Sequence, residues 1–300
     1  MEKELGCRKP DFLIIGAGKA GTNALRNYLD QHPDISMSSR QEPNFFCSLA
    51  RTCGETKGIR SWREYLATFD GAGAGQVLGE ASPMYLYMPG TAEAIHSSVP
   101  DVKLIAMLRQ PAERLFSRYM HLERIGRSAG MSLEDLWKED SIWWTRRDLV
   151  REGFYYEHLK RYYDLFDRRQ IAVFIYEEYR ERPAIIYREI CEFLEVDTAF
   201  VPELGVRLNQ SGRIRSKFVD GIIGEEGVVK RVLRESMPGA LEWVRRRPQI
   251  VKAIGLTRAR ILEKPSLDVD VRRRITERIY KKDIVALAPL IGRDLSGWLD

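Results

Sequence analysis

Residues 11–31 (DFLIIGAGKAGTNALRNYLDQ) constrain the fold of this chain more than any other stretch. Residues 12–15 form a short, continuous apolar run, which is typical of a parallel strand buried on both faces. Three glycines follow, and apolar residues then recur at helical spacing from Ala24. A glycine-rich turn of this kind directs the free N–H groups of a helix start at one point, where an anion is favoured. Lys19 adds a positive charge inside the turn, so the stretch predicts a site for a phosphate or a similar anion.

Strand-like and helix-like segments alternate along the rest of the chain. Short strands are predicted at residues 34–37 and 77–80, and buried apolar strands at 102–108 and 171–176. Helices are predicted over residues 62–69, 92–98, 111–126, 155–165, 183–194 and 267–290. Residues 38–48, where Pro43 opposes a regular helix, and basic residues 206–217 are predicted as loops. This alternation predicts a single α/β domain over residues 1–300, with a mainly parallel central sheet flanked by helices. Within it, residues 218–265 are a candidate helical lid or acceptor-binding region.

The composition limits the classes of ligand and partner. The chain has 48 basic and 43 acidic residues and a net charge of +5, which suits an anionic ligand without requiring nucleic acid. The four cysteines form no CxxC pair and histidine is scarce, so we expect no metal site and reduced thiols. Neither a signal-peptide core nor a run of about 20 apolar residues is present, so we expect a cytoplasmic protein without a membrane span. The sequence leaves the oligomeric state open.

The glycine spacing Gly16-x-Gly18-x-x-Gly21 literally matches the dinucleotide fingerprint. A dinucleotide site also needs an acidic residue or an arginine at the end of the second strand, and Arg40 and Glu42 both lie beyond that strand. The lysine in the turn would crowd a pyrophosphate, and it precedes the last glycine instead of following it as in a Walker motif. An NAD(P)-dependent oxidoreductase and a purely structural glycine turn stay open as alternatives.

A second anion site is predicted where the apolar run 102–108 ends. Arg109 stands at that end, Pro111 then opens a helix, and Ser117 lies two turns into the helix. Arg114 is interpreted as a structural ion-pair residue and is left out of the site. Two anion sites at the ends of parallel strands suit a nucleotide that is phosphorylated at both ends, because open parallel sheets bind ligands at that edge.

These motifs together resemble those of the sulfotransferases that use 3′-phosphoadenosine-5′-phosphosulfate (PAPS). The turn GKAGT at residues 18–22 is similar to their 5′-phosphosulfate loop, and residues 109–119 (RQPAERLFSRY) match their 3′-phosphate motif. Residues 41–46 (QEPNFF) and 79–85 (GEASPMY) resemble two segments of the heparan sulfate sulfotransferase branch, and residues 153–155 (GFY) resemble the aromatic stretch beside the adenine. The likeness covers most of the chain and is weakest at 120–150 and 218–262.

The resemblance implies a P-loop-like nucleotide-binding fold and in-line transfer of a sulfuryl group from PAPS to a hydroxyl or an amine. The acceptor implied is a carbohydrate or a small natural product. Glu42 is implied as the catalytic base, and Lys19 as the residue that stabilises the leaving phosphate. The residues implied to bind the nucleotide are Gly18, Lys19, Ala20, Gly21, Thr22, Asn23, Arg109, Ser117, Tyr155, Arg213 and Arg215.

One position departs from the heparan sulfate branch. That branch has a lysine after the glutamate of its Glu-Lys-Ser-Pro segment, whereas here Ala81 follows Glu80. A heparan-type acceptor contact is therefore not implied, and a purely structural role for Glu80 stays open. A binding module that has kept the fold and lost the chemistry is the non-enzymatic alternative. Five aromatic residues offer either acceptor surface or core packing: Trp137, Trp143, Trp144, Phe154 and Tyr156.

Overall fold

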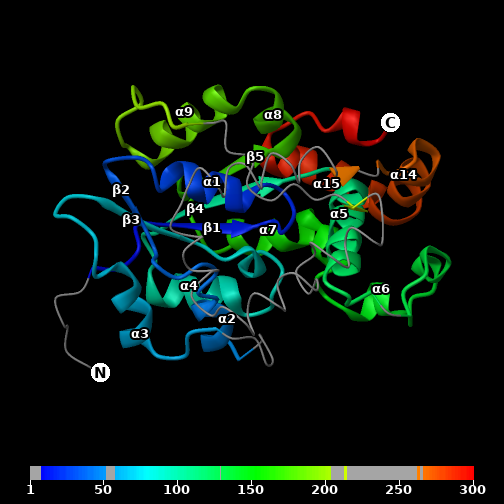
Figure 1. The fold of residues 1–300 in the computed structure, drawn as a ribbon, viewed down its shortest axis with the longest axis horizontal. Coiled ribbons are helices and arrows are strands. Elements are labelled where there is room, and N and C mark those ends of the chain that lie inside the picture. The colour runs from blue at the N-terminus through cyan, green and yellow to red at the C-terminus, as the bar shows by residue number, and fades with distance from the viewer. Residues whose placement is uncertain (1–7, 52–57, 129, 204–212, 215–261, 264–265) are drawn as a thin grey trace, which may run out of the picture. The chain divides into compact units, whose positions relative to one another are not determined.

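In the computed structural model, the apolar run after Asp11 forms the central strand of a parallel sheet (Figure 1). All five residues of β1 (Phe12–Gly16) are buried, as expected for a strand covered on both faces. The strand order is β2-β3-β1-β4-β5, and every pairing in this sheet is parallel. The predicted α/β fold with a mainly parallel sheet is therefore confirmed. The other strands are β2 (Ile35–Met37), β3 (Val77–Ala81), β4 (Lys103–Leu108) and β5 (Ile171–Ile175), with β2 and β5 at the two edges.

The structure describes residues 8–51, 58–128, 130–203, 213–214, 262–263 and 266–300. The chain divides into two units, of which the first comprises Met1–Tyr119, Ala129–Leu208 and Asp268–Asp300. The second comprises Met120–Ser128 and Asn209–Leu267. The sheet and the candidate site belong to the first unit. The predicted lid at 218–265 lies outside the described residues except for 262–263, so the single domain and the lid stay predictions.

The described helices mostly follow the predicted segments. They are α1 (Thr22–Leu29), α2 (Phe45–Leu49), α3 (Trp62–Leu66), α4 (Thr91–Ser98), α5 (Pro111–Arg124), α6 (Ile142–Thr145), α7 (Tyr155–Tyr163), α8 (Tyr176–Glu181), α9 (Pro183–Leu194), α14 (Val269–Ile275) and α15 (Lys281–Ile291). Short 3₁₀ turns are η1 (Ala67–Phe69), η2 (Pro83–Tyr85), η3 (Leu133–Trp137), η4 (Arg151–Gly153), η5 (Arg168–Gln170) and η7 (Ser296–Trp298).

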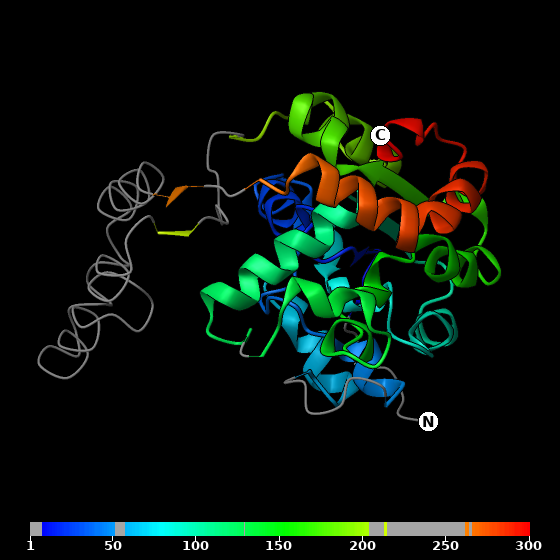
Figure 2. The ribbon, with the colours of Figure 1, turned by 90° about the vertical axis from the view of Figure 1, so that its right-hand side faces the viewer.

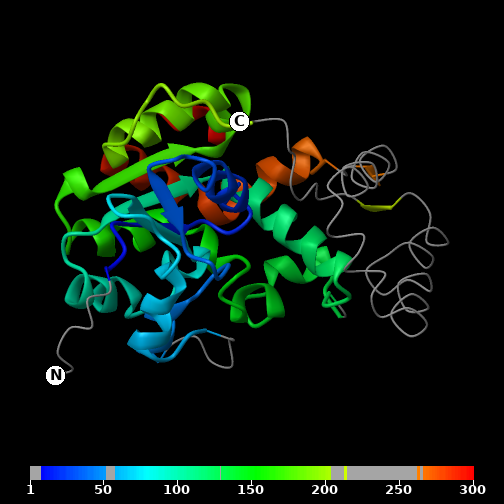
Figure 3. The ribbon, with the colours of Figure 1, turned by 60° about the vertical axis from the view of Figure 1, so that its left-hand side comes forward.

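Helices from early and late parts of the sequence pack around the sheet of the first unit. Helix α1 packs on β1, β2 and β3, and α8 and α9 pack on β5 (Figure 3). The C-terminal helices α14 and α15 follow one another as one long rod, joined by the π-helical segment η6 (Thr276–Tyr280), and α15 packs on α7 (Figure 2). The predicted helix over 267–290 is thus present, with a change of helical type in its middle.

Two predictions of local structure are wrong. The loop predicted around Pro43 becomes helical at Phe45, because the proline precedes α2 and does not interrupt it. Burial of Phe45 favours that helix, since its ring stacks on Tyr65 at 4.5 Å between centroids. In the second unit, the loop predicted over 206–217 contains strand β6 (Arg213–Ile214), which pairs antiparallel with β7 (Leu262–Glu263).

The C-terminal residues pack next to the end of β4. Trp298 is buried, and its carbonyl accepts a hydrogen bond from Gln110 Nε2 at 3.2 Å. The same amide nitrogen donates to Thr276 Oγ1 at 2.7 Å. The C-terminal segment therefore supports the residue that directly follows Arg109. Among the helices that the structure describes, none is long and apolar enough to cross a membrane, and the cytoplasmic location stays a prediction.

Candidate active site

The turn between β1 and α1 offers backbone N–H groups to a ligand. Gly21, the residue before α1, has a left-handed φ of 87°, which favours glycine. A Cβ atom at Gly21 would also lie 3.1 Å from the ring of Tyr176, so glycine is required there on two grounds. In the described part of the chain no side chain caps α1 at Gly21. The N–H groups of its first turn can therefore serve a ligand or water.

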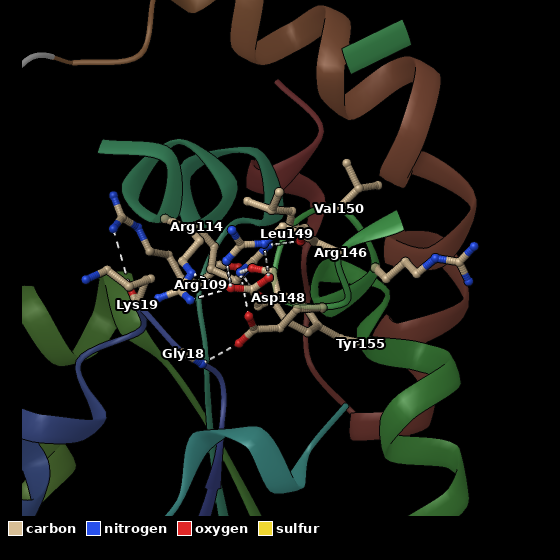
Figure 4. Close-up of polar contacts among 12 residues, drawn as sticks. Gly18, Lys19, Arg109, Arg114, Arg146, Asp148, Leu149, Val150 and Tyr155 are labelled. Carbon is tan, nitrogen blue, oxygen red and sulfur yellow. Dashed lines mark hydrogen bonds and ion pairs between the residues drawn. The ribbon is translucent and has the colours of Figure 1, made fainter. Parts of the chain in front are cut away.

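The sheet topology brings the two predicted anion sites together. Strands β1 and β4 are neighbours, so Arg109 at the end of β4 lies beside the glycine turn. Arg109 Nη1 lies 3.4 Å from the carbonyl oxygen of Lys19 and donates a hydrogen bond to it (Figure 4). The guanidinium also pairs with Glu113 at 2.9 Å and lies over the ring of Tyr176, 5.1 Å from its centroid. Two positive side chains are thus presented at one edge of the sheet.

Glu42 lies in the electric field of two cations. Burial raises the pKa of its carboxyl, and the positive charges of Arg118 and Lys19 offset part of that rise. The loop that carries Glu42 is fixed by Asn44, whose backbone N–H donates to Ser82 Oγ at 3.0 Å. Asn44 Nδ2 also donates to the carbonyl of Glu42 at 3.0 Å. A half-buried carboxylate is thereby held near the glycine turn.

Glu80 is a buried member of β3. Its carboxylate accepts a hydrogen bond from Ser82 Oγ at 2.7 Å and another from Tyr65 Oη at 3.4 Å. Its pKa is raised to about 7: burial is the largest cause, the hydrogen bonds offset part of the rise, and the charge of Glu42 adds to it. Because Glu80 has no exposed surface and its partners are hydroxyl groups of the core, these contacts support a structural role.

The remaining predicted nucleotide-binding residues lie in varied surroundings. Ala20 and Thr22 are buried in the turn, and Asn23 has a buried Oδ1 with no partner among the described residues, as expected of a group that a ligand would satisfy. Ser117 lies half-buried on α5. Tyr155 is fully buried, and its Oη donates to the carbonyl of Arg109 at 2.8 Å. Tyr155 therefore supports the strand end, and its predicted contact with the nucleotide stays a prediction.

Two predicted arginines cannot be placed. Arg215 lies outside the described residues, and for Arg213 only the backbone is described. Within the described ranges, no group of three or more His, Cys, Asp or Glu residues could hold a metal ion.

Two further residues enter the site without having been singled out from the sequence. Glu152 Oε1 accepts the N–H of Gly18 at 2.7 Å, and its other oxygen pairs with Arg114, so Arg114 does form the predicted structural ion pair. The positive charge of Arg118 lowers the pKa of Glu42, and its side chain forms an ion pair with Asp148. Arg146 and Arg118 together lower the pKa of Asp148 to about 2. No sequence signal could have identified Glu152, because its partner Gly18 lies 134 residues away.

A cavity of about 360 Å³ lies among the aromatic residues predicted as acceptor surface. Trp144 and Phe154 line it, whereas Trp143 is buried and donates its Nε1 hydrogen to the carbonyl of Ser132 at 2.7 Å. The cavity also presents arginines, and its lining includes Tyr87, Arg147, Arg151 and Arg161. Burial raises the pKa of Tyr87, and the positive charge of Arg118 offsets part of that rise, as it does for Glu42.

The protein has an α/β fold, and its candidate site presents positive side chains and backbone N–H groups at the carboxyl edge of a parallel sheet. A family model described as "Sulfotransferase domain" matches residues 9–206. The chain belongs to the sulfotransferase family. Membership of this family argues against the oxidoreductase suggested by the glycine spacing.

Individual relatives agree with this assignment. The chain is 26% identical over 231 residues to the bifunctional heparan sulfate N-deacetylase/N-sulfotransferase 1 of Caenorhabditis elegans, covering 72% of this chain and 26% of that protein. It is 31% identical to human heparan sulfate glucosamine 3-O-sulfotransferase 6, over 53% of this chain and 44% of the relative. These matches thus span less than half of the relatives' length. The crystal structure of a sulfotransferase from Alicyclobacillus acidocaldarius superposes with a TM-score of 0.70 at 28% identity, covering 98% of this chain and all of that one.

Proposed function

We propose that this enzyme transfers a sulfuryl group from PAPS to a hydroxyl or an amine of a carbohydrate or a small natural product. One observation carries the proposal: Arg109 Nη1 lies 3.4 Å from the Lys19 carbonyl, which supports two adjacent sites for anionic groups. A donor phosphorylated at both its 5′ and 3′ positions needs such a pair. The uncapped start of α1 and the unpartnered Asn23 Oδ1 fit a nucleotide in the turn.

Lys19 and Glu42 each have a role in the proposed reaction. PAPS supplies the sulfuryl group: a bond from sulfur to the acceptor oxygen or nitrogen forms, and the bond from sulfur to the bridging phosphate oxygen breaks. Lys19 and the N–H groups of the turn stabilise the negative charge that develops on that phosphate oxygen. Glu42 takes the proton of the acceptor, and its raised pKa increases its affinity for that proton.

The proposed acceptor carries a ring and an acidic group. Trp144 and Phe154 provide flat apolar surface in the cavity. The charged residues of its lining are Arg147, Arg151, Arg161, Glu139 and Glu157, so arginines outnumber carboxylates. Two relatives are named for heparan sulfate, which supports an anionic carbohydrate. Ala81 replaces the lysine of the heparan sulfate branch, which favours an acceptor bound in this cavity over one bound in the heparan manner.

A transfer assay tests the function directly. Labelled PAPS is incubated with the enzyme and a panel of sugars, acidic sugars, lipids and phenols, and label is expected on an acidic ring compound. Adenosine 3′,5′-bisphosphate is expected to protect the enzyme against heating, whereas NAD(P) is not. Transfer to no acceptor, combined with no protection by the bisphosphate, would refute the proposal.

The Lys19→Asn variant tests the role of the turn in the same assay. Asparagine removes the charge and tolerates the left-handed φ of 70° at this position better than other residues. We expect kcat to fall by about 10²–10³, as on removal of one preorganised stabilising group. The matched control is Lys138→Asn, which removes an exposed lysine paired with Asp135. A variant with normal kcat would exclude Lys19 from catalysis.

A further inference from the structure

A buried ion pair next to the glycine turn has no part in the proposed chemistry. Glu152 of η4 and Arg114 of α5 are both buried, and Arg114 Nη1 lies 2.9 Å from Glu152 Oε2. The other carboxylate oxygen accepts the N–H of Gly18 at 2.7 Å. A carboxylate beside a loop that binds phosphate would repel its ligand unless a cation neutralised it. Arg114 is in contact with Glu152 and provides that cation.

The pair belongs to a larger set of contacts that joins three parts of the site (Figure 4). Arg114 also donates to the carbonyl of Asp148 at 3.4 Å and to the carbonyl of Leu149. Tyr155, which follows Glu152 in the sequence, donates to the carbonyl of Arg109 at 2.8 Å. Residues 148–155 therefore connect the glycine turn, the end of β4 and the first turns of α5.

The approach of Glu152 to the turn explains one of the glycines. A Cβ atom at Gly18 would lie 2.8 Å from Glu152 Oε1, closer than real Cβ contacts allow. The backbone of Gly18 is not in the left-handed region, so its conformation does not demand glycine. Space for the carboxylate therefore accounts for this glycine of the Gly16-x-Gly18-x-x-Gly21 spacing.

We propose that Glu152 is a positioning residue for the donor loop: it holds the Gly18 N–H, while Arg114 cancels its charge. The fixed loop then presents Lys19 and the first turn of α1 to the same nucleotide that Arg109 binds. The inference rests on the proposed function, because it takes PAPS to be the ligand of the loop. Because the loop is held by the protein itself, the positioning exists before the nucleotide binds.

The test compares Glu152→Ala, Glu152→Gln and a matched control. Hydrogen exchange of residues 16–23 is followed by mass spectrometry without nucleotide, and the Kd of adenosine 3′,5′-bisphosphate is measured by calorimetry. For Glu152→Ala we expect faster exchange in the loop and a Kd raised by about 10–100-fold, since small misplacements of binding groups cost this much. Glu152→Gln keeps an oxygen that can accept the Gly18 N–H, so its effects should be smaller.

The control is Asp11→Asn. Asp11 precedes β1, at the end of that strand opposite the glycine turn, and it likewise accepts a backbone N–H, that of Leu78, at 2.7 Å. Its substitution should leave loop exchange and the bisphosphate Kd unchanged, which separates positioning from general destabilisation.

Two results for Glu152→Ala separate the positioning role from the identity of the ligand. Unchanged loop exchange and unchanged Kd in Glu152→Ala would overturn the positioning role. If Glu152→Ala speeds exchange in the loop but the wild-type protein does not bind the bisphosphate, the positioning of the loop is supported and PAPS is refuted as its ligand. If Glu152→Ala does not fold, Gly18→Ala is used instead, because the added methyl group displaces Oε1. Loop exchange at the wild-type rate in Gly18→Ala would equally overturn the inference.

Discussion

At the scale of single residues, the site depends on opposite charges held near one another in partly buried surroundings. Burial raises the pKa of Glu42 more than Arg118 and Lys19 lower it. A base acts in its ionised form, so activity should be lost as the pH falls through this raised pKa and should level off above it. The two cations limit the rise of the pKa and so favour the ionised carboxylate. In the proposed reaction, Lys19 would serve both anion binding and the electrostatic environment of the base.

Replacing Glu42 with glutamine tests this account. Glu42→Gln preserves size and removes the proton acceptor, so we expect kcat to fall by about 10²–10⁴ and the rise of activity with pH to disappear. The Kd of adenosine 3′,5′-bisphosphate should change little. The pH–rate profile and calorimetry provide the two measurements. Glu93→Gln, which alters an exposed glutamate of α4, is the control. Substantial remaining activity with an unaltered pH profile would show that Glu42 is not the base.

At the scale of elements, strand β3 and the loop that carries Glu42 form one unit. Ser82, just after β3, donates to Glu80 at 2.7 Å and accepts from the Asn44 N–H at 3.0 Å. A buried carboxylate thus orients the hydroxyl that holds the loop carrying Glu42. Since burial raises the pKa of Glu80 to about 7, its folded-state pKa lies above the ordinary value of 4.5. The folded state therefore binds this proton more tightly than the unfolded state does.

This difference in proton binding predicts the pH dependence of stability. The contribution of Glu80 is fully present below pH 4.5 and is lost as the pH rises through about 7. Glu80→Gln removes that dependence. The free energy of unfolding of the wild type, minus that of the variant, should therefore fall by up to about 3 kcal/mol between pH 4.5 and pH 8. Urea unfolding of both proteins at several pH values gives this difference, and a difference that does not vary with pH would contradict the raised pKa.

At the scale of the whole molecule, contacts between residues close in sequence were predictable and contacts between distant ones were not. Continuous apolar runs predicted β1, β4 and β5, because such strands are buried on both faces. The GKAGT turn and Arg109 were predicted as anion sites because each lies directly after a strand, where parallel sheets bind ligands. Helix α2 was missed because burial of Phe45 against Tyr65 decides its conformation, and that contact is tertiary.

The support of the site was not readable from the sequence for the same reason. Glu152 contacts Gly18 across 134 residues, and Gln110 contacts Trp298 across 188. No local sequence pattern around a glutamate or a glutamine indicates such a distant partner. The sequence therefore predicts which groups carry charge at the sheet edge, whereas the structure is needed to see what holds them in place.

Gln110 is the residue through which the C-terminus supports the site. Its side chain donates to Thr276 Oγ1 and to the carbonyl of Trp298, and it accepts the N–H of Glu113 at 2.8 Å. Gln110→Leu keeps the volume and leaves buried backbone groups unpaired, so the free energy of unfolding should fall by about 1–3 kcal/mol. Because Gln110 follows Arg109, the Kd of adenosine 3′,5′-bisphosphate should also rise.

Urea unfolding and calorimetry measure the two effects of Gln110→Leu, and Gln31→Leu serves as the control. Gln31 is an exposed glutamine that also bonds to the backbone, through Nε2 to Asn27 at 3.1 Å. Its loss should cost less, because water can replace the bond at the surface. Equal losses of stability in the two variants would show that the contact with Trp298 adds nothing. An unchanged bisphosphate Kd in Gln110→Leu would show that the C-terminal segment stabilises the fold without positioning Arg109.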